Sequence, residues 1–398
     1  MQPISVSRRA FAGAAVASSL ARVKGANERI SLGLIGVGSR GQYDLTEIIR
    51  CKGSNAAVTA VCDVYRPNRE RAAAVAAKAF GAKPRETDDY RELLAWREVD
   101  AVVVATPDSG HSKILEDAVK AGKDVYCEKP MGVDFAEAKS AFLAVKQSRQ
   151  VVQIGTQRRS EGQYIAAAKL MRSGILGQVT RVDIAAHFHE PRWRRDFHGV
   201  QESDVAWDRY LFNRPRRPFD ARRLREWQLF RDYTNGIAGL WLCHFSDLAH
   251  WFLDETYPAG AVASGGVYLW KDGRETADVF HCLLDYPKGI LFSFAMSLTN
   301  AAGSRNLWHG TRGTLDLDKW TISGDGAKGP DRLEQTIRIA PEAGDSHMRN
   351  FLDCLRSRQT PRCDIQAGFS HAVAGCMTST AFDAGRKVRF DPVKLEMI

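Results

Sequence analysis

The stretch ISLGLIGVGSRG, residues 30–41, decides how the first half of the chain folds. Residues 30–37 form an apolar run that predicts a buried parallel strand, and residues 42–51 predict a helix. Gly36, Gly38 and Gly41 therefore fall in a strand-to-helix turn, with Ser39 and Arg40 among them. Glycines at such a turn let a pyrophosphate approach the backbone, and the helix N-terminus supplies free N–H groups. The stretch predicts a dinucleotide-binding turn.

A second apolar strand, residues 57–62, ends at Asp63. Asp63 lies 22 residues after Gly41 (63 − 41), about where a carboxylate would bind the adenosine ribose hydroxyls. Because a carboxylate repels a 2'-phosphate, this favours NAD as the cofactor, with NADP less favoured. Tyr65 and Arg66 follow in the same cofactor-binding segment, and Arg66 keeps NADP open because an arginine there can hold the phosphate.

Strands and helices alternate through the first half of the chain, which predicts an N-terminal Rossmann domain with a doubly wound parallel sheet. Ligands of such sheets lie beyond the carboxyl ends of the strands, where Asp63, Thr106 and Lys129 all fall. Further strands are expected at residues 101–105, 124–127 and 151–154, and helices at 69–80, from about 111 to 121, and at 135–147.

The segment Glu128-Lys129-Pro130 follows an apolar strand. Pro130 removes a backbone donor and biases Lys129 away from helical geometry, so the chain leaves its strand in a fixed direction. In isolation the segment reads as a surface ion pair before a helix. Its place at a strand end makes Lys129 the first candidate for a catalytic residue.

Taken together, these motifs resemble the Gfo/Idh/MocA family of sugar oxidoreductases. The resemblance rests on Gly36 to Gly41, Asp63, the 105–111 segment, Glu128-Lys129-Pro130 and Gly155-Thr156-Gln157. It implies that Lys129 contacts the reacting hydroxyl and the nicotinamide ribose. It also implies a homo-oligomer, and further cofactor contacts from Glu128, Gln157, Thr106, Pro107 and His111.

In the second half of the chain the hydrophobic pattern changes to alternating or mixed strands from Val179 onward. This pattern predicts an α+β domain with a large, open, mainly antiparallel sheet. Its turn Tyr286-Pro287-Lys288-Gly289 predicts a hairpin. We expect three parts: residues 1–26 as a signal, 27–150 as the dinucleotide-binding domain and 151–398 as the substrate-binding and oligomerisation domain, whose last helices could pack back on the first. Strands are expected at 179–189, 261–270, 277–286, 290–298, 313–318 and 334–340, and helices at 346–357 and 367–382.

His244 is the second catalytic candidate. His244 and Asp247 are three residues apart on an expected helix and so share a face. The family pattern resembles Asp-x-Gly-x-His-x-x-Asp, but Leu240 and Leu242 stand where its aspartate and glycine would be. For His244 the alternative is a structural histidine, and for Asp247 it is support of the helix.

The segment 191–231 carries eleven arginines against six acidic residues, with several aromatic residues between them. One interpretation is an irregular, solvent-exposed segment. The other is a loop that binds an anion or a sugar, because guanidinium groups suit carboxylates and aromatic faces suit sugar rings. No nucleic-acid-binding pattern accompanies it. The substrate-contact candidates are Arg159, His187, Arg192, Trp193, Trp227, Arg231 and Asp247.

The amino terminus contains Ser7-Arg8-Arg9 followed by a small, uncharged run from Ala12 to Leu20. This is typical of a twin-arginine export signal, which predicts a periplasmic or otherwise exported protein that folds in the cytoplasm. A frayed basic tail and a cytoplasmic protein are the alternative. No later run is apolar and long enough for a membrane span. The eight cysteines lack ligand spacing, so we expect no metal site and structural thiols.

Three functions remain open on sequence grounds. The first is an NAD-dependent oxidoreductase that acts on a secondary alcohol of a sugar or glycoside, with tightly bound NAD because an exported enzyme meets no soluble NAD pool. The second is a glycoside hydrolase that uses transient oxidation, elimination and re-reduction. The third is a non-catalytic protein that binds NAD or a sugar. The arginines suggest that the sugar is anionic.

Overall fold

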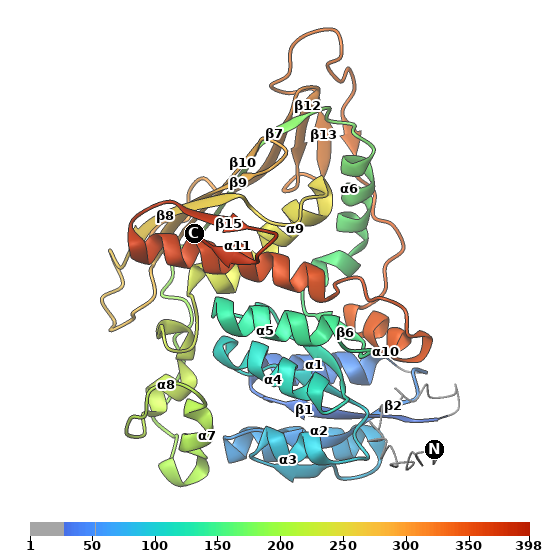
Figure 1. Cartoon of the computed structure of the whole chain (residues 1–398), viewed down its shortest axis with the longest axis vertical. Coiled ribbons are helices and arrows are strands. Elements are labelled where there is room, and N and C mark those ends of the chain that lie inside the picture. Colours follow the sequence, from blue (N-terminus) through green and yellow to red (C-terminus); the bar gives the residue numbers. More distant parts are fainter. Residues whose placement is uncertain (1–27, 52) are drawn as a thin grey trace, which may run out of the picture.

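The computed structural model describes residues 28–51 and 53–398, so the predicted export signal lies outside the described residues. Two sheets organise the chain, with the parallel sheet in the lower part of Figure 1 and a larger sheet in the upper part. Within the described residues, no helix combines the length and the apolar character that a membrane span requires.

The first sheet has six parallel strands in the order β3-β2-β1-β4-β5-β6, as predicted for a Rossmann domain. All four residues of β4 are buried, because helices cover both faces of the sheet. Helices α1, α2 and α10 share one apolar core with it, and α4 and α5 share the other. The strands are β1 (Ile30–Ile35), β2 (Ala56–Cys62), β3 (Arg85–Thr87), β4 (Ala101–Val104), β5 (Asp124–Cys127) and β6 (Val152–Ile154).

Helices α1 and α2 begin three residues earlier than the sequence predicts, because the turn residues before the predicted starts are already helical, whereas α5 begins at the predicted residue 135. Tertiary packing also brings α10 from the far end of the chain onto this domain, where Phe351 and Leu352 are buried in the core that contains α1 and α2, and the Phe351 ring lies 5.7 Å from that of Tyr126 on β5. The helices are α1 (Ser39–Arg50), α2 (Arg66–Phe80), α3 (Tyr90–Ala95), α4 (Asp108–Lys120), α5 (Phe135–Lys146), α6 (Gly162–Arg172), α9 (Cys243–Leu253), α10 (His347–Ser357) and α11 (Ile365–Ala384).

The second sheet has ten strands in the order β14-β13-β12-β11-β7-β10-β9-β8-β15-β16. Strands β7 and β10 pair in parallel and the other pairs are antiparallel, which agrees with the predicted mainly antiparallel sheet. Helices α9 and α11 pack with its apolar side chains in one core. The strands are β7 (Val179–His187), β8 (Gly260–Gly266), β9 (Val279–Tyr286), β10 (Ile290–Ser297), β11 (Arg305–Gly310), β12 (Gly313–Asp316), β13 (Thr321–Ser323), β14 (Ile337–Arg338), β15 (Val388–Asp391) and β16 (Glu396–Met397).

Two differences from the predicted strands have a physical cause. Strand β11 was not predicted because its sequence RNLWHG is largely polar. It forms because Trp308 is fully buried and its indole N–H donates to the Asn306 amide oxygen at 2.9 Å. The strand predicted at 334–340 is reduced to Ile337–Arg338, since most of that segment is exposed.

Residues 188–236 form a separate small unit, called the lobe below. It contains α7 (Trp207–Leu211), α8 (Ala221–Arg225) and a small core of its own that includes Tyr210 and Phe230. The lobe follows β7 of the large sheet, yet Figure 1 shows α7 and α8 beside the helices of the parallel sheet. Two main-chain hydrogen bonds attach it there, from Ala206 N to Val64 O at 2.8 Å and from Ser109 N to Tyr233 O at 3.0 Å.

Candidate active site

The glycine turn after β1 is built for close approach of the backbone. Gly36 has a φ of 82°, a left-handed conformation that favours glycine. A Cβ atom on Gly36 would lie 2.7 Å from the Thr106 amide nitrogen, and one on Gly41 would lie 2.1 Å from the Gly36 carbonyl oxygen. Both positions therefore need glycine, and α1 begins at Ser39, between them, with its free N–H groups at the turn.

Asp63 closes the same turn from the end of β2. Its carboxylate accepts hydrogen bonds from Val37 N at 2.7 Å and from Tyr65 N at 2.8 Å. Burial raises the pKa of the Asp63 carboxyl, and the two main-chain donors oppose that rise. Each carboxylate oxygen has a second lone pair, so Asp63 keeps acceptor capacity for ribose hydroxyls.

A cavity of about 280 Å³ opens at this turn between the parallel sheet and the lobe. The glycine turn and the ends of β2 and β4 form one wall. The lobe forms the opposite wall. From the predicted cofactor residues the cavity is lined by Gly36, Gly38, Ser39, Arg40, Asp63, Tyr65, Thr106 and Pro107, and from the lobe by Arg195, Arg209, Tyr210, Phe212, Leu224, Arg225, Trp227 and Gln228.

These features fit a dinucleotide. The tight glycine turn, from which Gly36 and Gly38 line the cavity, presents main chain to a pyrophosphate, and Asp63 provides a carboxylate at the ribose position. The lobe residues were not predicted as cofactor contacts. Their sequence signal is the cluster of arginines and aromatic residues, but only the folded chain brings that cluster opposite the glycine turn.

Glu128 is held in a buried network next to this cavity. Arg40 pairs with Glu128 at 2.7 Å and with Asp44 at 3.0 Å. The Gln157 amide donates to Glu128 at 2.8 Å and to the Tyr126 hydroxyl at 3.0 Å. The network thus joins the α1 side of the cofactor turn to the strand ends that carry Glu128 and Gln157.

Lys129 lies at the junction of the two domains. Its Nζ donates to the main-chain carbonyl of Leu240 at 3.0 Å. Leu240 belongs to a π-helical turn, η4 (Ala238–Leu242), that leads into α9. Such turns are frequent at functional sites, and here the turn presents a carbonyl oxygen to the lysine. Where the family pattern places an aspartate, this chain therefore offers Lys129 a main-chain oxygen.

His111 connects the ends of two parallel strands. Its ring nitrogens lie 3.0 Å from the Thr106 carbonyl oxygen and 2.7 Å from that of Pro130. His111 is buried, so its contact with the cofactor wall runs through Thr106. It fixes the direction of the Lys129-Pro130 segment, whose peptide bond is cis.

His244 lies on the first turn of α9. Burial, followed by the positive charges of Lys129 and Arg158, lowers the pKa of His244 well below its usual value. The ring is therefore neutral near pH 7. Within the described part of the chain its Nδ1 atom is buried and has no hydrogen-bond partner. His244 is thus a neutral imidazole beside Lys129 with one unused ring nitrogen.

Arg159 and Asp247 bind each other in the interior. The Arg159 Nε atom lies 3.0 and 2.9 Å from the two carboxylate oxygens, and Nη2 lies 2.9 Å from one of them. The Asp247 side chain is 1% exposed. This pair fixes α9, and with it His244, against the segment that follows β6.

The other substrate candidates lie in several places. Trp227 lines the cofactor cavity. Arg192 stacks on Phe188 at 4.0 Å and on Trp241 of the π-helical turn at 4.9 Å. Trp193 is half-buried between the lobe and the main core, and His187 is the last residue of β7. Arg231 is exposed and pairs with Asp383. Arg66, which was predicted for the cofactor segment, pairs with Asp204 of the lobe and with Glu70.

Comparison with known proteins identifies the family. Residues 30–156 match the NAD-binding Rossmann domain of the Gfo/Idh/MocA oxidoreductases, and residues 168–390 match their C-terminal α/β domain. The chain belongs to this oxidoreductase family.

Individual relatives match over a smaller part. Inositol 2-dehydrogenase of Rhizobium meliloti is 28% identical over 157 residues, which are 39% of this chain and 45% of that protein. An uncharacterised oxidoreductase, C115.03, of Schizosaccharomyces pombe is 35% identical over 135 residues, 33% of this chain and 36% of that protein. The matches thus span less than half of these curated relatives.

Solved structures share the fold over most of the chain. The aldose-aldose oxidoreductase of Caulobacter crescentus, complexed with glycerol, has a TM-score of 0.68 and 17% identity, and covers 91% of this chain and 100% of its own. The WlbA dehydrogenase of Bordetella pertussis, in complex with NADH and UDP-GlcNAcA, has a TM-score of 0.68 and 19% identity, with coverage of 92% and 99%.

A buried histidine behind Lys129 predicts acid sensitivity. His371 Nε2 accepts from Met131 N at 3.1 Å, and burial lowers the pKa of His371 to about 4. Its contribution to the free energy of unfolding is present above the unfolded pKa near 6.5 and is lost as pH falls toward 4. Between pH 7 and pH 5 we expect the unmodified protein to lose about 2 kcal/mol more than His371→Gln, whose amide oxygen can still accept from Met131.

Urea unfolding at the two pH values measures this difference. The exposed His198 supplies the control, since His198→Gln is expected to follow the unmodified protein. Equal pH dependence in His371→Gln and the unmodified protein would contradict the assignment.

Proposed function

We propose that the protein is an NAD-dependent oxidoreductase that oxidises a secondary alcohol of a sugar or related cyclic polyol. The observation that carries the proposal is Lys129 at the domain junction, with the neutral His244 near it and a cavity of about 280 Å³ at the glycine turn of the adjoining sheet. Bound NAD would supply the acceptor for the carbon-bound hydrogen of the alcohol. As the carbonyl forms, Lys129 Nζ would relay the hydroxyl proton, giving one of its own protons to the neutral His244 as it receives that of the hydroxyl.

The sugar class is supported by the family and by its named relatives. Inositol 2-dehydrogenases are recurrent among the relatives, and a neighbour in fold is an aldose-aldose oxidoreductase. The site adds one argument of its own. Trp241 belongs to the turn that contacts Lys129 and packs against Phe188, and aromatic faces suit the C–H faces of sugar rings.

A panel of aldoses, inositols and sugar acids, added to the purified protein, tests the proposal through the nicotinamide absorbance. NADH formation with a member of the panel is the expected result. Bound NAD that no compound reduces would instead favour a non-catalytic binding protein.

We infer that NAD is retained between turnovers, because the lobe forms one wall of its cavity. Several polar contacts attach the lobe to the parallel-sheet domain, and one of them ends on Ser109 at the cavity. Arg214 donates to the Ser109 carbonyl at 3.2 Å and pairs with Glu137 at 3.5 Å. Release of the cofactor requires these contacts to open.

The Arg214→Gln variant should therefore release NAD about tenfold faster, since a charged hydrogen bond contributes about 1.5 kcal/mol or more. Arg216→Gln is the matched control, because the partner of Arg216 among the described residues is Asp208, which also belongs to the lobe. The NAD content after extended dialysis measures both variants. Equal retention in the two would show that the lobe does not hold the cofactor.

NAD is proposed in preference to NADP. Asp63 stands at the ribose position of the cavity, where its carboxylate disfavours a 2'-phosphate, whereas Asp88 and Asp89 of the lining are paired with Arg209. Arg66, the residue that kept NADP open, is exposed and engaged by Asp204 and Glu70. Comparison of the two dissociation constants tests this choice.

A redox-neutral glycoside hydrolase is the second candidate, and Leu240 favours it. The carboxylate of the family pattern is replaced by an apolar side chain, which is compatible with a changed chemistry at the same lysine. Nitrophenol release from both anomers of a chromogenic glycoside, without net NADH, would support this alternative. Accumulation of NADH or of a keto sugar would exclude it.

Export and oligomerisation are proposed as well. The twin-arginine pattern supports a periplasmic site of action, and retained NAD agrees with a compartment that lacks a soluble NAD pool.

The large sheet exposes Leu283 and Leu291 on neighbouring strands, a surface suited to contact with a second copy of the chain. Cell fractionation and light scattering test the two proposals.

A further inference from the structure

Arg158 lies close enough to His244 for its positive charge to lower the pKa of that histidine, and its guanidinium stacks on two aromatic rings. It lies in a single 3-10 turn, η1 (Gln157–Ser160), directly after β6. Its guanidinium lies 4.5 Å from the centre of the Phe245 ring and 5.4 Å from that of Tyr164. Its two chain neighbours are also held, Gln157 by Glu128 and Arg159 by Asp247.

The guanidinium of Arg158 has no acceptor. Within residues 28–51 and 53–398 it forms no ion pair and no side-chain hydrogen bond, and its Nη1 atom is buried without a partner. Arg40 and Arg159, the other two arginines of this site, are paired with carboxylates. A buried donor that lacks an acceptor costs about 1–3 kcal/mol, and more when it is charged, so the arrangement calls for an anion from outside the chain.

The carboxylates of the site are already engaged. Asp247 binds Arg159, Glu128 binds Arg40 and Gln157, and Asp108 accepts from the Thr234 hydroxyl at 2.7 Å. The family pattern has an aspartate at position 240, but this chain has Leu240, so that position contributes no carboxylate. Lys129 and Arg158 therefore act together on His244 as two positive charges, which agrees with the lowered pKa of that histidine.

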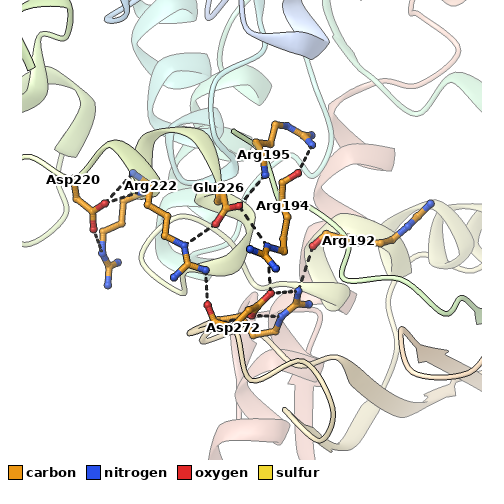
Figure 2. A network of polar contacts seen from close by, with 9 residues as sticks. Arg192, Arg194, Arg195, Asp220, Arg222, Glu226 and Asp272 are labelled. Atoms are coloured by element: carbon orange, nitrogen blue, oxygen red, sulfur yellow. Dashed lines mark hydrogen bonds and ion pairs between the residues drawn. The ribbon is translucent and has the colours of Figure 1, made fainter. Parts of the chain in front are cut away.

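The network in Figure 2 shows that the many arginines of the lobe do not offer the same opportunity. There Arg222 Nε donates to Glu226, which is 1% exposed, at 2.7 Å, and Arg194 Nε lies 4.0 Å from the same carboxylate. Arg274, which lies outside the lobe, is held by Asp272 through two hydrogen bonds of 2.9 Å. Arg222 and Arg274 thus have carboxylate partners inside the protein, whereas within the described residues Arg158 has none.

We propose that Arg158 binds the carboxylate of an acidic sugar, and that the enzyme is specific for sugar acids over neutral sugars. The inference rests on the proposed oxidoreductase function for the reaction, and it adds the substrate class. A guanidinium fork matches a planar carboxylate through two parallel hydrogen bonds, and the Phe245 face keeps the fork from turning away. The sugar then places its reacting hydroxyl at Lys129 and its anion at Arg158.

Paired substrates test the specificity. Glucuronate and glucose, and galacturonate and galactose, differ only in the carboxylate, and glucose 6-phosphate adds a different anion. We expect at least one sugar acid to reduce bound NAD with a kcat/KM about tenfold or more above that of its neutral partner. In Arg158→Gln, kcat/KM for the acid should fall about ten- to hundredfold relative to kcat/KM for the neutral sugar, as expected for loss of a charged hydrogen bond.

Arg97→Gln is the control, because Arg97 is exposed on the parallel-sheet domain and its loss changes the net charge equally. Equal loss for acid and neutral sugars in Arg158→Gln would overturn the inference, and so would a preference for the neutral sugar or for the phosphate alone.

Calorimetric binding to the NAD-loaded protein separates this inference from the proposed reaction. A sugar acid that binds the unmodified protein, fails to bind Arg158→Gln and reduces no NAD would contradict the oxidoreductase function and retain the anion site. Absence of sugar-acid binding to the unmodified protein would overturn the anion site, whatever the outcome with neutral sugars.

Discussion

The Lys129→Met variant is expected to keep its bound NAD and to lose NADH formation by about 10²–10⁴-fold, the usual contribution of a positioned proton-transfer group. Methionine preserves much of the apolar stem and removes Nζ, the atom that donates to the Leu240 carbonyl at 3.0 Å. The cavity at the glycine turn does not include Lys129, so the substitution leaves the main cofactor contacts in place.

Two variants make this result specific. Lys78 is exposed on α2, so Lys78→Met removes an equal charge without touching the site and should keep full activity. Lys129→Arg keeps the charge but replaces a compact ammonium group with a planar fork, so it should also lose most activity. NADH formation in Lys129→Met at more than a tenth of the unmodified rate would remove Lys129 from the reaction.

The Gly41→Ala variant is expected to purify largely without NAD. The new Cβ atom would lie 2.1 Å from the Gly36 carbonyl oxygen, and this neighbour is backbone that cannot rotate away. The turn must open, at a cost of about 1–3 kcal/mol or more for an overpacked position. If that cost falls on the cofactor-binding conformation, NAD affinity drops about ten- to hundredfold.

Gly199→Ala is the matched control, since a Cβ atom there meets nothing within 4 Å. Circular dichroism distinguishes loss of the cofactor from loss of the fold. A folded Gly41→Ala protein that retains stoichiometric NAD would contradict the assignment of the turn as the pyrophosphate site.

The parallel sheet follows from local sequence patterns, and the lobe does not. Strands such as β4 are buried on both faces and so are continuous apolar runs, which can be recognised without knowledge of their neighbours. The position of the lobe depends on contacts between residues far apart in the chain, such as Arg209 with Asp88. Its arginine content was visible in the sequence, but the cavity wall that it forms was not.

The pattern around α9 shows the same limit at the candidate site. The sequence places His244 and Asp247 on one helical face, and the structure shows that Asp247 faces Arg159 in the interior. The sequence also shows Leu240 at the position where the family pattern has an aspartate. That a π-helical turn presents the Leu240 carbonyl to Lys129 could not be predicted, because it depends on backbone geometry at a domain junction.

The central claim is that this chain holds NAD and uses Lys129 to oxidise a sugar alcohol with it. The most direct measurement is the absorbance of reduced nicotinamide when the sugar panel is added to the protein as purified, with no NAD supplied. The account predicts that the unmodified protein carries NAD and forms NADH, whereas Lys129→Met carries NAD and forms none. A protein that purifies without NAD and binds none when it is supplied would contradict the account.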